Sequence, residues 1–319
     1  MTDCHLVDRK ASSVDALELV SPLMRPTFIG IGSARCGSTW LHRSLGLHPD
    51  IQVSTPKQIC YFNQMIRTRS LEWYWSHFEP DPDCPSAPIR GEVTPFYARL
   101  SRHSVDSVLH LLPDVRVLLS IRNPVERCWS GACLDLGHYG GRTLPGIPTS
   151  ALYRYFQRQR VIRYADYEQI ISRWSSRGRS SRLHVLLFDE LQQDPIRVLE
   201  PVLKHLGASS NWRPPAGELR KVVRPEGPDQ ERWSMPESVR WYLSRQWLEP
   251  TRRLNRHLDG RVQGWVDSME SVVGRSTTSW RLQRAFTRFV GCVPEAVAYR
   301  AYDQLNEWSL RRAWRRIGG

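Results

Sequence analysis

The sequence predicts an α/β fold with a P-loop-like central parallel sheet flanked by helices, followed by a helical C-terminal extension. Three observations predict it. The segment TFIGIGSARCGSTWLHRSL at 27–45 has the pattern of a buried strand, a glycine-bearing turn and a helix. The runs VRVLLSI at 115–121 and LHVLLF at 183–188 are apolar on both faces, as central strands of a parallel sheet are. Helical patterns follow both runs, so strands and helices alternate along the chain.

The remaining elements follow from shorter patterns. Ile51 and Val53 predict a short strand, and GEVTPFY at 91–97 places an acid at the end of a short apolar segment. Apolar residues at helical spacing predict helices at 101–112, 150–175, 195–206 and, beginning with Pro236, 236–247. Glycine- and proline-rich composition predicts loops at 137–148, a candidate substrate lid, and at 208–235.

These elements divide the chain into three parts. Residues 1–26 read as a flexible polar arm, 27–265 as the main domain and 266–319 as a basic helical extension. Residues 281–319 hold eight arginines against three acids, with apolar residues at helical spacing. This pattern fits an amphipathic helix docked on its own domain, or attachment to an anionic surface or a partner.

Composition narrows the classes of partner and the compartment. The chain of 319 residues carries 45 basic and 32 acidic side chains, a net charge of +13 that favours anionic ligands. It shows no zinc-finger or RNA-binding signature, so we expect no nucleic-acid partner. Seven cysteines without a C-x-x-C pair indicate reduced thiols in the cytoplasm and no zinc site. We expect neither a signal peptide nor a membrane-spanning segment.

The first candidate site is the loop Gly32–Thr39, which nearly satisfies the Walker A pattern. A strand that enters such a turn aims backbone N–H groups and a helix N-terminus at one point, which suits a phosphate or sulfate group. Ser38 occupies the position of the Walker lysine, and the cation in the loop is Arg35. The loop therefore suits a nucleotide that lacks a β,γ-phosphate pair. Lys57 and Gln58 are expected at a nearby strand or loop edge.

The second candidate site follows the strand at 115–121. Arg122 stands at its carboxyl end, where ligands bind in open α/β sheets, and Ser130 lies eight residues later in a helix. Together they would form a compact anion clamp. The run FDE at 188–190 resembles a Walker B strand end. An enzyme that uses a nucleoside triphosphate, such as a kinase, is therefore an alternative, although it lacks the Walker lysine.

The ordered set of motifs over Thr27 to Trp265 resembles the sulfotransferases that use 3′-phosphoadenosine-5′-phosphosulfate (PAPS), particularly the bacterial and heparan-sulfate-type members. GSARCGSTWL resembles their 5′-phosphosulfate loop and RNPVERCWS their 3′-phosphate motif. LHPDI, PKQICYF and GEVTPFY are similar to the segments between, the last two to the K-E-x-x-F-F and E-K-T-P-x-Y types. The resemblance implies a sulfotransferase that transfers the sulfuryl group to a hydroxyl or amine.

The resemblance also implies roles for single residues. Arg35 would contact the 5′-phosphate and its bridging oxygen and neutralise charge on the leaving group. Arg122 and Ser130 would hold the 3′-phosphate of PAPS and of the product, 3′-phosphoadenosine-5′-phosphate (PAP), without any metal. The 5′-phosphate would be held by the loop and the start of the helix after it, at Cys36, Gly37, Ser38, Thr39 and Trp40. Arg232, in the loop at 208–235 that matches the family only loosely, would contact the nucleotide.

The sequence departs from the family pattern at two positions, Gln58 and Val93, and the first concerns the general base. Gln58 stands where heparan-sulfate-type members have the glutamate base, and a neutral amide cannot accept the proton of a hydroxyl. Glu92 is the nearby acid in a family motif and is our candidate, with His138 a weaker one; an acceptor such as a phenol would need little base. Val93 replaces a lysine of the pattern. A protein of this fold that binds the nucleotide without turnover is therefore a second alternative.

The predicted acceptor is a small molecule or a glycan. The aromatic and arginine residues of the chain would suit an acidic or an aromatic acceptor equally well. The sequence predicts no oligomeric state.

Overall fold

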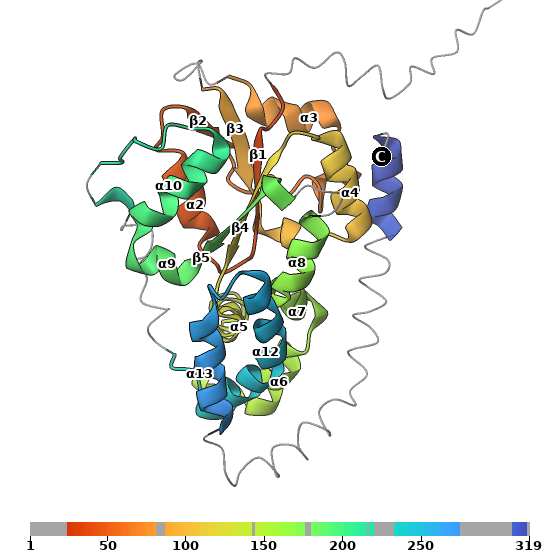
Figure 1. Ribbon diagram of the computed structural model, residues 1–319. Helices are drawn as coiled ribbons and strands as arrows, with labels where there is room; N and C mark the ends of the chain where they lie inside the picture. The colour runs from red at the N-terminus through yellow and green to blue at the C-terminus, as the bar shows by residue number, and fades with distance from the viewer. Residues whose placement is uncertain are drawn as a thin grey trace, which may run out of the picture.

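The protein is built around a five-stranded sheet, shown in the computed structural model of Figure 1. The structure describes residues 24–80, 87–141, 144–175, 180–215, 217–219, 233–274 and 308–317. The strand order is β2-β3-β1-β4-β5, and each neighbouring pair is parallel. The strands are β1 (Phe28–Gly32), β2 (Ile51–Val53), β3 (Ile89–Val93), β4 (Arg116–Ile121) and β5 (Leu183–Leu187).

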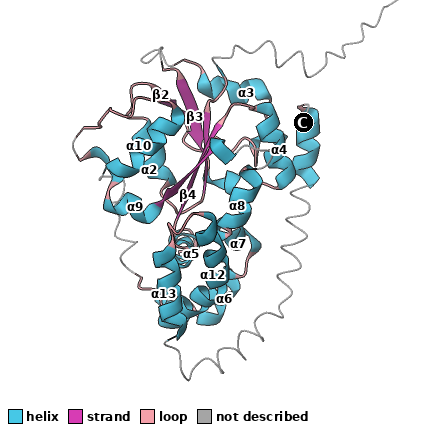
Figure 2. Cartoon of the chain, viewed as in Figure 1, coloured by secondary structure: helices cyan, strands magenta, loops and turns pink. Residues whose placement is uncertain are grey.

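Alternating side chains of the strands build one core on each face of the sheet. Phe28 of β1 and Leu118 of β4 point to one face and belong to the cluster that includes Trp40 and Leu203. The helices of that face are α2 (Ser38–Leu45), α9 (Phe188–Gln193) and α10 (Pro195–Leu206). Figures 1 and 2 show them gathered on one side of the sheet. The prediction of a central parallel sheet flanked by helices is confirmed.

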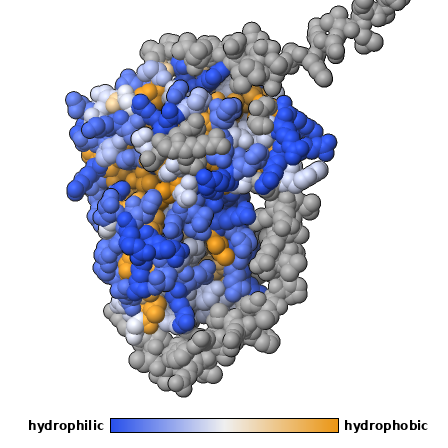
Figure 3. All heavy atoms as spheres, turned by 45° about the vertical axis from the view of Figure 1, so that its right-hand side comes forward, coloured by the Kyte–Doolittle hydropathy of each residue, from blue (hydrophilic) through white to orange (hydrophobic). Residues whose placement is uncertain are grey.

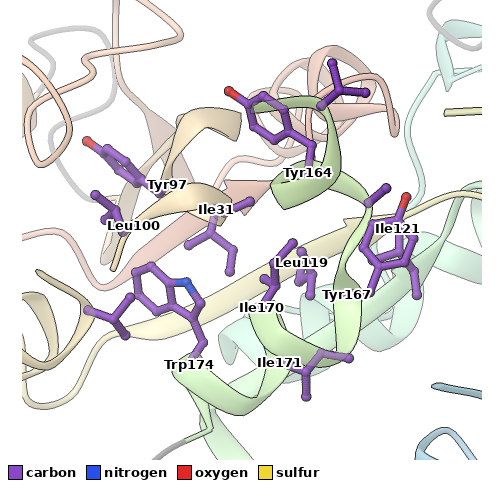
Figure 4. Packing of buried hydrophobic residues seen from close by; sticks show 14 of the residues in the cluster. Ile31, Tyr97, Leu100, Leu119, Ile121, Tyr164, Tyr167, Ile170, Ile171 and Trp174 are labelled. Carbon is purple, nitrogen blue, oxygen red and sulfur yellow. The ribbon is translucent and has the colours of Figure 1, made fainter. Parts of the chain in front are cut away.

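The opposite face carries the larger core. Ile31, Leu119 and Ile121 belong to it together with Ile170 and Trp174, and Figure 4 shows Leu119 beside Ile170 and Ile121 beside Tyr167. This core is covered by α4 (Arg102–Leu111), α7 (Gln159–Ala165) and α8 (Tyr167–Trp174), and it extends to α3 (Leu71–Trp75), α5 (Pro124–Ala132), α6 (Thr149–Phe156), α12 (Glu237–His257) and α13 (Gln263–Gly274).

The structure corrects three element boundaries. The expected helix at 150–175 is three helices. The first break falls at Arg158, whose backbone is extended, and the second at Asp166, which leaves helical geometry and caps α8 by accepting from the N–H of Gln169. The helix expected to end at Trp247 continues through Pro250 to His257, since its buried face continues to Leu254. The first two residues of the expected loop at 137–148 belong to a π-helical turn, Cys133–His138, which continues α5.

A short helix at 308–316 packs against the main domain. Leu310, Ala313 and Trp314 are buried in its core, and the indole of Trp314 stacks on Phe62 with ring centroids 5.6 Å apart. At these residues the docked arrangement of the C-terminal extension is observed. The other residues that suggested a helix, Val297, Ala301 and Leu305, lie outside the described residues.

The exposed surface shown in Figure 3 is mostly hydrophilic, with small hydrophobic areas between the polar ones. None of the helices in the described part of the chain is long and apolar enough to span a membrane.

Candidate functional site

The candidate site lies at the carboxyl ends of β1 and β4, which are neighbours in the sheet. From β1 the chain moves outward to β2, and from β4 it moves to β5 on the other side, so the two strands flank the point where the strand order reverses. Ligands of open α/β sheets bind at such a point. The loop before α2 and the N-terminus of α5 both open onto it.

Contacts from β4 and α5 fix the loop backbone. The N–H of Ser33 donates to the carbonyl of Ser120 at 2.6 Å, and the hydroxyl of Ser120 donates to the carbonyl of Cys36. The buried guanidinium of Arg127 donates to the carbonyl of Ala34 (3.2 Å) and to that of Val161 (2.9 Å). The loop is therefore held by charged and hydroxyl donors before any ligand arrives.

Three loop residues, Gly32, Arg35 and Gly37, have positive φ angles. Gly37 has a φ of 89° directly before α2, and a Cβ there would meet Leu191 and Phe188 at 3.0 and 3.1 Å. Arg35 has a φ of 71°, a conformation that is uncommon for a residue with a side chain and concentrates at functional sites.

Arg35 joins the two predicted anion sites. Its Nε donates to the hydroxyl oxygen of Ser130 on α5 at 3.0 Å, although the two residues are 95 positions apart in the sequence. Burial, then the charge of the neighbouring Arg122, lowers the pKa of Arg35 below its usual value. The site thus holds two guanidinium groups close together.

Arg122 is held at both its backbone and its side chain. Its N–H and its carbonyl both contact the hydroxyl of buried Tyr167, at 3.4 and 2.8 Å, and its guanidinium lies over the ring of Phe188 at 4.7 Å. Asn123 caps α5 by accepting from the N–H of Val125, so the helix begins directly after Arg122.

Lys57 adds a third cation. Its Nζ donates to the hydroxyl of Thr39 at 2.9 Å and reaches that of Ser38 at 3.4 Å. Burial, then the charges of Arg43 and Arg35, lowers its pKa to about 8. Within the described ranges, no carboxylate forms an ion pair with Arg35, Arg122 or Lys57. A cluster of cations without a paired anion is the arrangement expected of an anion-binding site.

Glu92, the candidate base, lies in a different environment at the end of β3. It is fully buried, and its carboxylate accepts from the hydroxyls of Tyr74 (2.8 Å), Tyr97 (2.8 Å) and Thr94 (2.5 Å), and from the N–H of Ile59. Burial raises its pKa, and these donors act in the opposite direction. With four donors and no exposed surface, the carboxyl has no access to an acceptor, which argues against its being the base.

The other candidate residues differ in exposure. Ser38 and Gln58 are half-buried, and Thr39 is exposed. Trp40 points away from the loop into the core around α2, where its Nε1 donates to the carbonyl of Leu219 at 3.1 Å. His138 is exposed at the end of the π-helical turn. Arg232 lies outside the described residues.

The acids of FDE have partners outside the loop, although burial raises the pKa of Asp189 and the charge of nearby Arg122 opposes that effect. Asp189 accepts from the indole N–H of Trp265, and Glu190 pairs with Arg261 at 3.1 Å. No group of three or more metal-ligating side chains was found among the residues that the structure describes. The geometry gives no support to a magnesium-nucleotide site built on Asp189.

Two residues that contact the loop or the start of α2 were not assigned from the sequence. Lys57 was expected only near the first site, because nothing in its local pattern shows that it reaches Thr39. Arg127 was not singled out, since an arginine on a helix is ordinarily exposed; its position beside the apolar residues Val125, Cys128 and Trp129 was the available signal.

Comparisons with known proteins agree with this geometry. The family model for the sulfotransferase domain matches residues 25–225. The membrane-associated sulfotransferase kil1 of Dictyostelium discoideum is 35% identical over 108 residues, which are 34% of this chain and 22% of that protein. The mouse (Mus musculus) bifunctional heparan sulfate N-deacetylase/N-sulfotransferase 1 is 27% identical over 206 residues, 58% of this chain and 22% of that protein. The chain spans about a fifth of the length of these two curated relatives.

A solved structure shows the same fold. The sulfotransferase from Alicyclobacillus acidocaldarius superposes with a TM-score of 0.62 at 20% identity, over 76% of this chain and 98% of that one. The family model covers more than half of the chain, including the loop of Arg35 and the motif of Arg122 and Ser130. The resemblance seen in the sequence is confirmed, and the chain belongs to the sulfotransferase-domain family.

Proposed function

We propose that the protein is a PAPS-dependent sulfotransferase that moves the sulfuryl group to a hydroxyl or amine of a small-molecule or glycan acceptor. The observation that carries the proposal is the contact between Arg35 and Ser130, which brings the two anion motifs into one site beside Arg122. A donor with a phosphosulfate at one end and a 3′-phosphate at the other requires two such sites at a fixed separation. A nucleoside triphosphate does not.

The donor fits the residues present. The loop N–H groups before α2 and the hydroxyls of Ser38 and Thr39 would hold the 5′-phosphosulfate, as anions are held at helix N-termini. Arg122 and Ser130 would hold the 3′-phosphate, and Arg122 can do so with two parallel hydrogen bonds. The cation cluster supplies positive charge for both of these anionic groups.

In the proposed reaction an acceptor oxygen or nitrogen forms a bond to sulfur as the bond from sulfur to the 5′-phosphate oxygen breaks. The acceptor loses its proton to solvent, and negative charge collects on the 5′-phosphate of PAP. Arg35 would stabilise that charge, so the rate enhancement would come from positioning and electrostatics. The same logic applies to phosphoryl transfer.

The class of acceptor depends on which group can take its proton. Gln58 cannot accept a proton, and Glu92 is fully buried with four donors. We therefore propose an acceptor that ionises readily, a phenol before an aliphatic alcohol. The cytoplasm is the proposed compartment, where PAPS and a protein with reduced thiols would meet.

The direct test is transfer of labelled sulfate from PAPS to matched panels of phenols, aliphatic alcohols, amines and oligosaccharides. We expect labelled product with phenols first, and loss of product with Arg35→Ala. Binding of PAP without turnover on any panel would favour the alternative of a nucleotide-binding protein without transferase activity. Failure to bind PAP would reject the proposal.

A further inference from the structure

The phosphate loop has Ser38 at the sequence position where a Walker A loop has its lysine. An ammonium group nevertheless lies beside Ser38 in the structure. It comes from Lys57, in the segment after β2, whose Nζ contacts the hydroxyls of Ser38 (3.4 Å) and Thr39 (2.9 Å). A residue 19 positions after Ser38 therefore brings a lysine charge to the N-terminus of α2.

The segment that carries Lys57 is fastened to the sheet on both sides of that residue. Before it, the N–H of Ser54 donates to the carbonyl of Gly91 at 2.8 Å. After it, the N–H of Ile59 donates to the carboxylate of Glu92, and that of Cys60 to the hydroxyl of Thr94 at 3.3 Å. The ammonium is held by an internal framework, unlike that of a lysine on a free surface loop.

The charges around Lys57 come from the loop and from α2. Arg35 faces it from the loop, and Arg43 and His42 face it from α2. Burial, then Arg43 and Arg35, brings the pKa of Lys57 to about 8, so about half of the side chains are neutral at pH 8. Burial lowers the pKa of His42, so His42 is neutral at that pH. An anion bound in the loop would favour the ammonium form of Lys57.

We propose that Lys57 is a donor-binding residue that replaces the missing loop lysine, contacts the phosphosulfate group together with Arg35, and takes up a proton when the donor binds. This inference rests on the proposed function, because it requires that the donor end group sits in the loop. The proton comes from solvent and adds to Nζ, so no other reactant is needed.

The expected signature is a protonation change that depends on pH. At pH 8 donor binding takes up about half a proton per site, and at pH 6.5 close to none, because Lys57 is already charged there. Donor affinity therefore falls as the pH rises above 8. An arginine at this position keeps its charge, so its binding would show neither the uptake nor that loss of affinity.

The experiment is calorimetric titration of the full chain with PAP at pH 6.5 and 8, in two buffers of different ionisation enthalpy. The variants are Lys57→Met, Lys57→Arg and the matched control Lys204→Met, which alters an exposed lysine in the last turn of α10. Because Lys57→Arg leaves His42 and the phosphates of PAP unchanged, it separates their protons from that of Lys57.

We expect Lys57→Met to bind PAP about tenfold or more weakly, as loss of one charge-assisted hydrogen bond does. Lys57→Arg should bind PAP with an affinity within a few-fold of that of the unmodified protein, but without proton uptake. Lys204→Met should match the unmodified protein in PAP affinity and in proton uptake. Unchanged affinity in Lys57→Met, or uptake that persists in Lys57→Arg, would overturn the inference while PAP binding upheld the donor site. No PAP binding by the unmodified protein would instead overturn the proposed function.

Discussion

Two groups of ionisable side chains lie at the same edge of the same sheet and differ in every physical respect. At the ends of β1 and β4, Arg35 and Arg122 lie close together, half-buried and without a carboxylate partner in the described part of the chain. At the end of β3, Glu92 is fully buried and accepts from three hydroxyls and one N–H. The guanidinium groups of Arg35 and Arg122 can still bind an anion, whereas the carboxylate of Glu92 is already occupied by protein donors.

This difference distinguishes motif residues that stabilise the fold from motif residues that are available to bind a ligand. Both groups belong to segments that resemble family motifs, and the sequence therefore proposed chemistry for both. Satisfied hydrogen bonds in a buried site contribute to stability, whereas uncompensated charge at a strand end costs stability and remains available to a ligand. The partners of a residue, more than its place in a motif, indicate whether it acts in binding or in folding.

The largest expected effect is at Arg35. Arg35→Ala should lower the rate of sulfate transfer about 100- to 1,000-fold, as removal of one donor from a developing anion does, with little change in the free energy of unfolding. Transfer kinetics and urea denaturation measure the two quantities. A large loss of stability with an unchanged rate of transfer would show that Arg35, like Glu92, acts in folding and not in catalysis.

The next effect is at Glu92, with the opposite signature. Glu92→Ala leaves buried hydroxyls and an N–H without an acceptor and should cost about 3 kcal/mol of stability. Tyr97→Phe, which removes one of those donors, should cost about 1 kcal/mol in the same urea titrations. If Glu92→Gln instead abolished turnover at unchanged stability, Glu92 would be the general base after all.

The smallest effect is at Glu190, whose pair with Arg261 is about half exposed. Glu190→Gln should change stability by less than about 1 kcal/mol and leave PAP affinity unchanged. Titration with ATP, with and without Mg²⁺, should show no magnesium-dependent binding in either protein. Magnesium-dependent ATP binding that the substitution weakened would revive the triphosphate alternative.

The fold and the two anion motifs could be predicted because their signals are local. Apolar runs define β4 and β5, and the pattern of glycines and small polar residues defines the turn into α2. The ends of the long helices were less predictable, since burial of the face around Leu254 carried α12 through Pro250. Side-chain capping by Asp166 likewise divided the helical pattern at 150–175.

The parts that could not be predicted are contacts between distant segments. Nothing near Lys57 shows that its ammonium meets Thr39, and nothing near Glu92 shows that Tyr74 and Tyr97 occupy its carboxylate. A motif alignment places these residues in order along the chain without placing them in space. The domain boundaries proposed at residues 26 and 265 and the cytoplasmic location stay predictions.

The central claim is that one site recognises both ends of a 3′-phosphorylated donor. The most direct measurement is calorimetric titration of the unmodified protein and of Arg122→Ala with PAP and with adenosine 5′-phosphate, without metal. We predict a strong preference for PAP that Arg122→Ala reduces about tenfold or more, while affinity for adenosine 5′-phosphate stays within a few-fold. Equal affinities for the two nucleotides in the unmodified protein would contradict the claim.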